Sequence, residues 1–372
     1  MPSPPRTLED VARLAGVSRN TVSLAIRNSP RVQADTRERV LRIVRDTGYR
    51  PNHAARSLAG RRTSTVGVVT FGDSRMGSAS VDSFYDAILS GVRQVLDAVD
   101  HDLLLLSSRR LAGTPDLAAP LASGRADALI VLGVDTDRAA VAAAAATGAP
   151  IVHIGRRDFG PVAVPYVTAD EAGGMAQAVR HLADHGHRRL AVVAEDLAFE
   201  PTADKIEAAR ATCEQLGLGP GALRTATASP GDADSVRACI RAMLADDVTA
   251  ALPMRAPLAV ALVRGLREVG VRVPDGFAIV GYGNTEWTPL IEPPLTCITP
   301  RLFEMGVAAG RLALELIEDR EAAWPRIVPN SLVARRSCGC AWSPLDAADE
   351  RPLSGEAAPS DVAPTTGRGA PA

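Results

Sequence analysis

The sequence has 372 residues, 46% hydrophobic and 23% charged, with a formal net charge of −2 and a mean hydropathy of +0.05. Length and composition predict a globular protein of two or three domains, and no apolar run reaches the length of a membrane span. Because the first residues include no apolar signal segment, we expect a cytoplasmic protein whose five cysteines are reduced thiols.

The charge is distributed unevenly along the chain. Residues 1–62 contain 13 arginines and 5 acidic residues, a charge of +8, whereas the remaining residues carry −10. A basic first segment on an acidic body predicts that a polyanion binds the first segment alone.

The basic segment begins with a short amphipathic helix. Thr7, followed three residues later by Asp10, predicts a capping box at the helix start. Apolar residues then recur with the spacing of one helix face, at Leu8, Val11, Ala12 and Ala15. Gly16 can adopt the left-handed conformation that ends a helix, so a tight turn is expected there.

A second short helix is expected after this turn. Ser18 is a good N-cap residue. The buried face of the helix consists of Val22, Ala25 and Ile26. The opposite, outward face consists of Arg19, Asn20, Ser23, Leu24 and Arg27. Two short helices joined by a glycine turn predict a helix-turn-helix, whose second helix offers its N-terminal residues to the DNA major groove; an ordinary helical hairpin is the alternative.

Residues 35–46 predict a third helix, which completes a small headpiece with Tyr49 in its core. Residues 51–62 can form a further helix, but a segment this short is not stable alone. We therefore expect a hinge helix that becomes ordered only when a partner holds it.

From Val66 onward, short β-branched runs alternate with longer helical segments. The expected strands are 66–70, 103–107, 128–133, 150–155, 190–195, 223–228, 249–253, 277–282, 295–300 and 327–335. Nearly continuous apolar strands separated by helices predict parallel sheets that are covered on both faces. Two such lobes, joined by several crossings of the chain, predict a ligand cleft at the strand ends between the lobes.

These patterns divide the chain into four parts. We expect a headpiece at 1–50, a hinge helix and linker at 51–63, a bilobed effector-binding and dimerisation domain at 64–342, and a disordered tail at 343–372. The tail is rich in Pro, Ala, Asp and Gly and has no hydrophobic periodicity.

The order of these parts resembles that of the LacI/GalR family of bacterial transcription regulators. The segments that carry the resemblance are TLEDVARLAGVSRNTVS (7–23), YRPNHAARSLAGRRT (49–63), HLADHGHRRLAVV (181–193), GVRVPDGFAIVGY (270–282) and PPLTCITP (293–300). The resemblance implies an α/β fold: a helix-turn-helix headpiece and hinge helix before a periplasmic-binding-protein-like body with two doubly wound parallel sheets. It also implies a homodimer that binds a near-palindromic double-stranded DNA operator and is controlled by a small-molecule effector.

The resemblance places the readers of base edges at Arg19 and Asn20, and their chemistry agrees, since Arg favours guanine and Asn favours adenine. Leu24 stands where the family usually has Arg, and it can offer only an apolar contact, for example to a thymine methyl group. The remaining DNA-binding residues expected in the headpiece, as phosphate contacts or caps, are Thr7, Ser18, Thr21, Ser23 and Asn28.

In the hinge, Leu58 matches the leucine that inserts into the minor groove at the operator centre. Ala55 and Arg56 match the residues that line the groove beside it. Asn52 completes the expected DNA-binding set.

The resemblance places an effector site in the cleft, formed by Phe71, Phe84, Tyr85, Gly155, Arg156, Lys205, Arg255, Gly283 and Asn284. Phe84 and Tyr85 match an aromatic position that packs against ligands. Lys205 stands where sugar-binding members usually have Arg, and Arg255 replaces a customary Asn.

Three positions of this set lack the carboxylates that bind sugar hydroxyls in the family: Gly155, Gly283 and Asn284. A cleft that loses carboxylates and keeps cations predicts an anionic effector, such as a sugar acid or a phosphorylated sugar. Alternatively, the cations pair with acidic neighbours such as Asp204 or Glu286, and the cleft binds something else, such as a sugar or another small metabolite, or nothing.

No cofactor or metal is expected. His181 and His185 have the i, i+4 spacing of a metal site, but histidines at a helix end are more often caps or surface groups. Cys338 and Cys340 form a pair too isolated for a zinc site and are expected to be free. Because no nucleophile has a recognisable base beside it, we do not expect an enzyme. The remaining alternative is a solute-binding protein with the same body and no regulatory role.

Overall fold

The computed structural model describes residues 7–26, 31–49, 62–71, 78–107, 117–133, 136–197 and 199–341, with the side chains of the helix at 78–97 described from residue 84. The chain divides into two compact units, Met1–Thr63 and Ser64–Ala372. The expected hinge helix at 51–62 and the expected disordered tail lie almost entirely outside the described residues.

The first unit contains the three expected helices, α1 (Leu8–Ala15), α2 (Arg19–Ile26) and α3 (Ala34–Thr47). The predicted capping box is confirmed: Asp10 N donates to Thr7 Oγ1 at 3.2 Å, and Thr7 N donates to Asp10 Oδ2 at 3.3 Å. The three helices share one small core, which includes Val11, Val22, Val40 and Tyr49. Local capping and packing therefore define the headpiece by itself.

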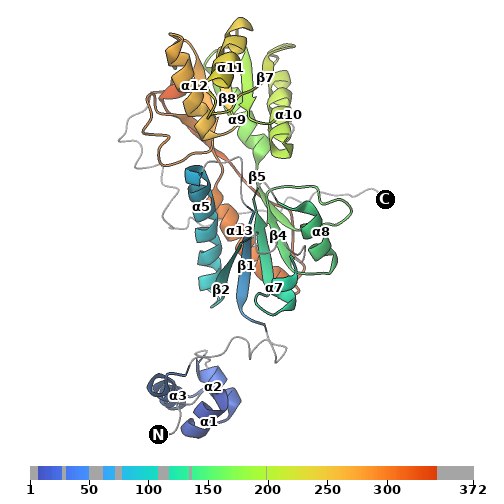
Figure 1. Cartoon of the computed structure of the whole chain (residues 1–372), viewed down its shortest axis with the longest axis vertical. Helices are drawn as coiled ribbons and strands as arrows, with labels where there is room; N and C mark the ends of the chain where they lie inside the picture. Colours follow the sequence, from blue (N-terminus) through green and yellow to red (C-terminus); the bar gives the residue numbers. More distant parts are fainter. Residues whose placement is uncertain are drawn as a thin grey trace. The chain divides into compact units, whose positions relative to one another are not determined.

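Six parallel strands form the sheet of the first lobe, in the order β11-β5-β4-β3-β1-β2 (Figure 1). These strands are β1 (Thr65–Thr70), β2 (Asp102–Ser107), β3 (Ala128–Leu132), β4 (Ile151–Ile154), β5 (Tyr166–Ala169) and β11 (Arg326–Val328). Buried clusters join one face to α5 (Ser78–Asp97) and α13 (Leu302–Ile317), and the other face to α7 (Ala119–Ala122) and α8 (Arg138–Ala146). The predicted sheet with both faces covered is confirmed.

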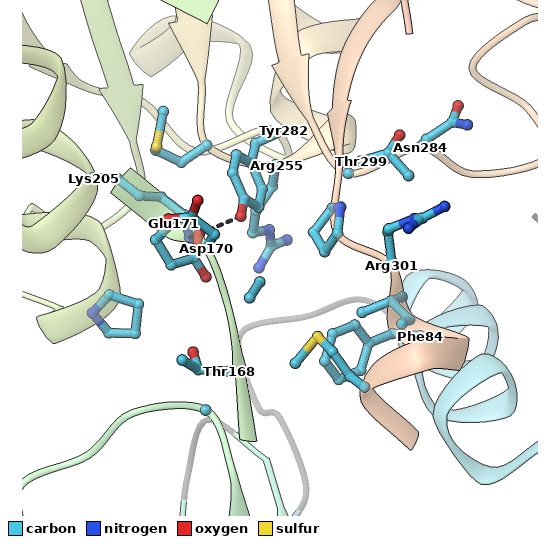
Figure 2. A pocket seen from close by; sticks show the side chains of 18 of the residues that line it. Phe84, Thr168, Asp170, Glu171, Lys205, Arg255, Tyr282, Asn284, Thr299 and Arg301 are labelled. Atoms are coloured by element: carbon cyan, nitrogen blue, oxygen red, sulfur yellow. Dashed lines mark hydrogen bonds and ion pairs between the residues drawn. The ribbon is translucent and has the colours of Figure 1, made fainter. Parts of the chain in front are cut away.

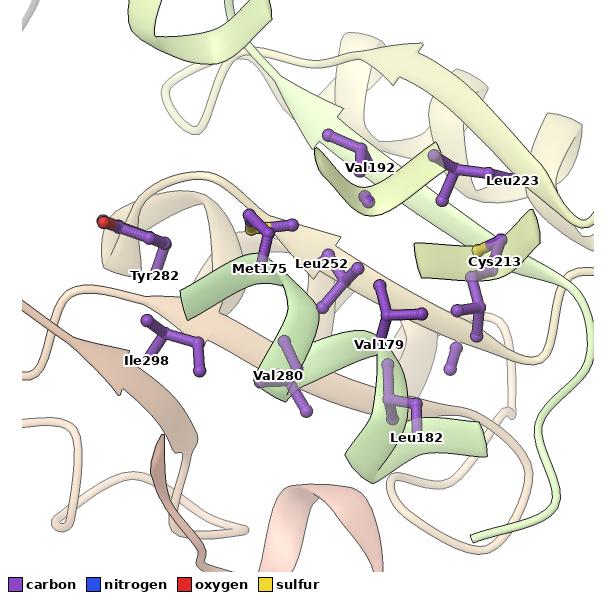
Figure 3. Close-up of a cluster of buried hydrophobic side chains, with 14 of the residues drawn as sticks. Met175, Val179, Leu182, Val192, Cys213, Leu223, Leu252, Val280, Tyr282 and Ile298 are labelled. Atoms are coloured by element: carbon purple, nitrogen blue, oxygen red, sulfur yellow. The ribbon is translucent and has the colours of Figure 1, made fainter. Parts of the chain in front are cut away.

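The second lobe has a six-stranded sheet in the order β12-β10-β9-β8-β6-β7. Its strands are β6 (Leu190–Ala194), β7 (Leu223–Thr227), β8 (Ala250–Pro253), β9 (Ala278–Tyr282), β10 (Thr296–Thr299) and β12 (Ser331–Val333). Figure 3 shows the core between this sheet and the helices α9 (Glu171–Asp184) and α10 (Glu200–Gln215). The opposite face is covered by α11 (Ala233–Ala245) and α12 (Ala256–Glu268), and a 3₁₀ turn, η1 (Arg336–Cys338), follows β12.

The sequence predicted a single strand at 327–335, and the structure differs from this prediction. The segment forms two strands, β11 in the first lobe and β12 in the second, and β12 pairs antiparallel with β10. The second sheet is thus parallel except at this edge. Pro329 lacks an N–H donor and lies between the two strands, where the chain leaves one sheet and enters the other.

The chain crosses between the lobes three times: after β5, after β10 and after β11 (Figure 1). Two of these crossings are fastened together, since Asp170 N donates to Val328 O at 2.8 Å and Asn330 Nδ2 donates to Asp170 O at 3.0 Å. The lobes are therefore separate sheets joined at a hydrogen-bonded hinge. None of the described helices is both long and apolar enough to cross a membrane.

One buried polar residue in the first lobe gives the fold a pH dependence. His153, on β4, is 0% exposed, and its Nδ1 donates to Gly155 O at 2.7 Å. Burial, opposed by that hydrogen bond and reinforced by the charges of Arg157 and Arg138, lowers the pKa of His153 from 6.5 to about 4.

We expect stability to fall between pH 6.5 and pH 4, because the unfolded chain protonates His153 in this range and the folded chain does not. The unfolded state binds more protons there, so the free energy of unfolding decreases as the pH falls, by up to about 3 kcal/mol. Urea unfolding of the parent and of a His153→Asn variant, which keeps a donor for Gly155, measures this loss. An equal loss in both proteins would contradict the assignment to His153.

Candidate functional site

The first turn of α2 is the exposed polar surface of the headpiece. Ser18 Oγ accepts from Thr21 N at 3.1 Å and lies 2.8 Å from Thr21 Oγ1, so Ser18 caps the helix as predicted. Arg19 and Asn20 are exposed; the Arg19 side chain is 64% accessible, and its Nη1 forms a long ion pair of 3.8 Å with Glu9 Oε2. Two long, exposed side chains with hydrogen-bonding ends thus project from a capped and rigid helix start.

Leu24 differs in part from its expected place on the outward face. It is half-buried and packs against the headpiece core, so only part of its side chain can contact a partner.

Ser23 is half-buried, and Thr7 holds its hydroxyl group in the capping box with Asp10. The remaining expected DNA-binding residues lie outside the described residues and stay predictions: Asn28, Asn52, Ala55, Arg56 and Leu58.

The body has a cleft of about 1450 Å³, which both lobes line. Eight of the nine predicted effector residues line it: Phe84, Tyr85, Gly155, Arg156, Lys205, Arg255, Gly283 and Asn284. Phe71 is not among the lining residues, and its carbonyl oxygen accepts a hydrogen bond of 3.0 Å from the Tyr85 hydroxyl group. The Phe71 backbone therefore helps to orient Tyr85, which lines the cleft.

Lys205 is the single lysine of the sequence and lies at the centre of a buried network in the cleft (Figure 2). Its Nζ lies 3.2 Å from Glu171 Oε2 and 4.2 Å from the centre of the Tyr282 ring. The Tyr282 hydroxyl group donates to Glu171 and accepts from Asn330 Nδ2 at 3.0 Å. Burial and the Glu171 charge raise the pKa of Tyr282 well above its usual value, so the phenol stays protonated.

Two arginines of the cleft, Arg255 and Arg156, also face carboxylates. Arg255 Nη1 lies 3.0 Å from Glu195 Oε2, and both side chains are about three-quarters buried. Arg156 forms an ion pair with Asp204. Such pairs offer a ligand donors and acceptors side by side.

The charge balance corrects the expected excess of cations. Among the described residues that line the cleft, seven are cationic and eight are acidic. The cationic residues are Arg138, Arg156, Arg157, Lys205, Arg255, Arg301 and Arg335. The acidic residues are Asp170, Glu171, Glu195, Asp196, Asp204, Glu207, Glu286 and Glu304. Asp204 on α10 pairs with Arg156, as the alternative interpretation expected, and α9 and the loop after β6 supply Glu171 and Glu195 as partners of Lys205 and Arg255. The shortage of anions on which the anionic effector rested is therefore absent from the described lining.

Sequence reasoning also missed several polar groups in the cleft. Arg335, 1% exposed, donates from Nη2 to Asn284 Oδ1 at 3.0 Å, and Thr288 Oγ1 donates to the same oxygen at 2.7 Å. These bonds orient the Asn284 amide so that its N–H groups remain for a ligand. An arginine late in the chain gave no sequence signal, because only the third crossing carries it back to this wall.

Two hydroxyl groups of the cleft wall are buried without a hydrogen-bond partner among the described residues, Thr285 Oγ1 and Thr299 Oγ1. Figure 2 shows Thr299 beside Asn284, at the end of β10. A buried hydroxyl group without a partner is costly, and a bound ligand with hydroxyl groups of its own can supply one.

Comparison with known proteins identifies both units. Residues 7–52 match the family described as bacterial regulatory proteins, lacI family, and residues 179–338 match the periplasmic binding protein-like domain. The chain is 32% identical over 342 residues to the HTH-type transcriptional regulator CelR of Thermobifida fusca, covering 90% of this chain and 98% of that protein. The chain belongs to the LacI family.

Further relatives in the family include catabolite control protein A of Priestia megaterium, which is 28% identical over 82% of this chain and 91% of its own length. A solved CelR–cellobiose complex has a TM-score of 0.62 at 29% identity, with 90% of this chain and 100% of that chain covered. The Lac repressor dimer bound to operator and the anti-inducer ONPF has a TM-score of 0.70 at 25% identity, with 90% and 99% covered. This LacI-family chain is accordingly a DNA-binding transcriptional regulator with an effector-binding body.

Proposed function

We propose that the protein is a repressor that binds a near-palindromic operator as a homodimer and changes its DNA affinity when a neutral carbohydrate occupies the cleft. The observation that carries this proposal is a capped helix-turn-helix with exposed Arg19 and Asn20, in one chain with a charge-balanced cleft between two lobes. The named relatives are transcriptional regulators, which supports a regulator rather than an enzyme. A solute-binding role alone would leave the basic headpiece without a use.

The operator contacts follow from the chemistry of the exposed helix start. Arg19 can donate two hydrogen bonds to guanine, and Asn20 can pair with adenine in the same groove. Leu24 presents only its exposed part, which suits a methyl group. Insertion of Leu58 at the operator centre remains part of the proposal, as does dimeric binding, which the relatedness to an operator-bound Lac repressor dimer supports.

The effector is proposed to be neutral because the cleft has its own counter-ions. The carboxylates of Glu171 and Glu195 compensate the charges of Lys205 and Arg255, two of the cations that line the cleft. Paired charges and the hydroxyl groups of Thr285 and Thr299 suit a ligand rich in hydroxyl groups, since each sugar hydroxyl both donates and accepts. The volume of about 1450 Å³ exceeds the usual range of roughly 300–1,000 Å³ and leaves room for a disaccharide.

One relative of this chain was solved in a complex with cellobiose, a neutral disaccharide, which makes cellobiose the first probe for this chain. The test has two readouts: operator binding by the full chain, on a near-palindromic site selected from randomised DNA, and the change in that binding when the sugar is added. If the chain does not bind DNA sequence-selectively, the proposal that it is a regulator is wrong. If it binds selectively but no small molecule alters that binding, only the proposed control by a ligand is wrong.

We expect calorimetry to show tighter binding of a neutral disaccharide than of its aldonic acid, because the acid brings a charge to a cleft in which Lys205, Arg255 and Arg156 already pair with carboxylates. Cellobiose and cellobionic acid form a matched pair, and other neutral disaccharides and their acids extend the comparison. Tighter binding of the acid throughout the series would contradict a neutral effector.

Changing Thr299 to Val should weaken sugar binding by a factor of about 3–10, the effect of one lost hydrogen bond of about 1 kcal/mol. Urea unfolding should show no loss of stability, because the removed hydroxyl group has no partner among the described residues. Thr288→Val is the control: its hydroxyl group bonds Asn284 Oδ1 at 2.7 Å, so this change should destabilise the fold. Unchanged sugar affinity in Thr299→Val would remove this hydroxyl group from the site.

Changing Arg19 to Ala should cost roughly 1–3 kcal/mol of operator binding and relax base preference at one symmetric position. Arg13→Ala removes an equally exposed arginine from the last turn of α1 and should lower affinity evenly across sequences. Fluorescence anisotropy over single-base operator variants distinguishes the two patterns. An even loss for Arg19→Ala as well would make Arg19 a phosphate contact.

A further inference from the structure

Four side chains with metal-binding atoms meet in the second lobe, away from the cleft. His181 lies in the last turn of α9 and His185 is the C-cap of that helix, and Cys338 and Cys340 come from η1 and the residues after it. Their nearest ligand atoms all lie within 4.8 Å of one another. None of the four lines the cleft. The expectation that the cysteine pair is isolated is therefore wrong, because the fold places it against both histidines.

The distances within this cluster are close to those of a tetrahedral site. Cys338 Sγ lies 3.1 Å from His181 Nε2, and Cys340 Sγ lies 3.3 Å from His185 Nε2 and 3.7 Å from His181 Nε2. Zinc bonds of about 2.3 Å to sulfur and about 2.05 Å to nitrogen require ligand separations of roughly 3.3–3.8 Å around a tetrahedron. Small side-chain movements bring all four atoms to such positions.

The backbone on both sides holds these residues in place. Histidines at i and i+4 lie on one face of α9, which is the helical spacing that chelates a metal. Ser337 is 0% exposed and fixes the other side, since its Oγ accepts from Thr296 N at 2.8 Å and donates to Ile279 O at 2.6 Å. Gly339 has φ 96°, a left-handed conformation that favours glycine and lets both cysteines face α9.

We propose that His181, His185, Cys338 and Cys340 bind one Zn²⁺ in a closed, structural Cys₂His₂ site. Thiolate and imidazole ligands suit zinc, whereas calcium and magnesium require oxygen ligands. Four protein ligands leave no position for a substrate, so the metal fastens the chain after β12 to α9 and performs no catalysis.

The thiol chemistry of the cluster agrees with metal binding. Zinc binds cysteine as the thiolate, so the metal displaces the thiol protons on binding. The site is partly accessible, since Cys340 is half-buried and His185 is exposed, so the ion has a path of entry.

The first experiment measures zinc in the full chain, purified without a histidine tag and kept reduced. We expect one zinc ion per chain by elemental analysis after dialysis against trace zinc, and a higher thermal unfolding midpoint with zinc than after chelation. Replacement by Co²⁺ should give the intense visible absorption of tetrahedral cobalt and a thiolate charge-transfer band. No stoichiometric metal, or the weak spectrum of octahedral cobalt, would overturn the proposal.

The second experiment uses the two more accessible ligands, so that the folded state is kept. His185→Gln and Cys340→Ser, singly and combined, should each lower zinc affinity at least tenfold and remove the effect of zinc on the unfolding midpoint. His187→Gln and Cys239→Ser are the controls, a histidine beside the cluster and a buried cysteine elsewhere, and should keep parental affinity. Parental affinity in the double variant, or equal losses in the controls, would contradict this ligand set.

Discussion

The side chain of Asn330 joins the parts on which ligand control depends. Its Nδ2 donates to Asp170 O, which fastens two chain crossings together, and to the Tyr282 hydroxyl group, which contacts Glu171 at the cleft wall. Glu171 in turn binds Lys205. A ligand that competes for Glu171 or Lys205 therefore acts on the same hydrogen bonds that hold the hinge. Since the two sheets share no strand, movement of one lobe relative to the other has to pass through these crossings.

The charge pairs explain why the cleft chemistry was only partly predictable. Comparison with family positions selected eight residues that line the wall. The pairing of Arg156 with Asp204 was expected as an alternative, whereas the contacts of Lys205 with Glu171 and of Arg255 with Glu195 were not. Charge in a cleft depends on which side chains meet in space, and a list of replaced positions does not contain that information.

In the fold, features decided by neighbouring residues were predictable from the sequence, whereas features decided by distant contacts were not. The headpiece was predictable almost in full, since the capping box of Thr7 and Asp10 and the glycine turn are decided within a few residues. Apolar runs predicted the strands of both sheets except β5 (Tyr166–Ala169), which none of the expected strands covers and whose residues alternate between half-buried and buried. The division of 327–335 into β11 and β12 was not predictable, because an apolar run has no feature that assigns its halves to different sheets.

The division of 327–335 into two strands also decides the role of the residues that follow Asn330, as far as residue 341. After Asn330 at the hinge, β12 brings Arg335 to the cleft wall, where it orients Asn284, and three residues later Cys338 joins the proposed zinc site. A metal that fixes Cys338 and Cys340 to α9 holds Arg335 at one position in the second lobe. Helix α9 itself begins at Glu171, beside the hinge. The proposed metal would therefore make the second lobe move as one rigid body. Ligand binding would then move the lobes about the hinge and would not deform the second lobe.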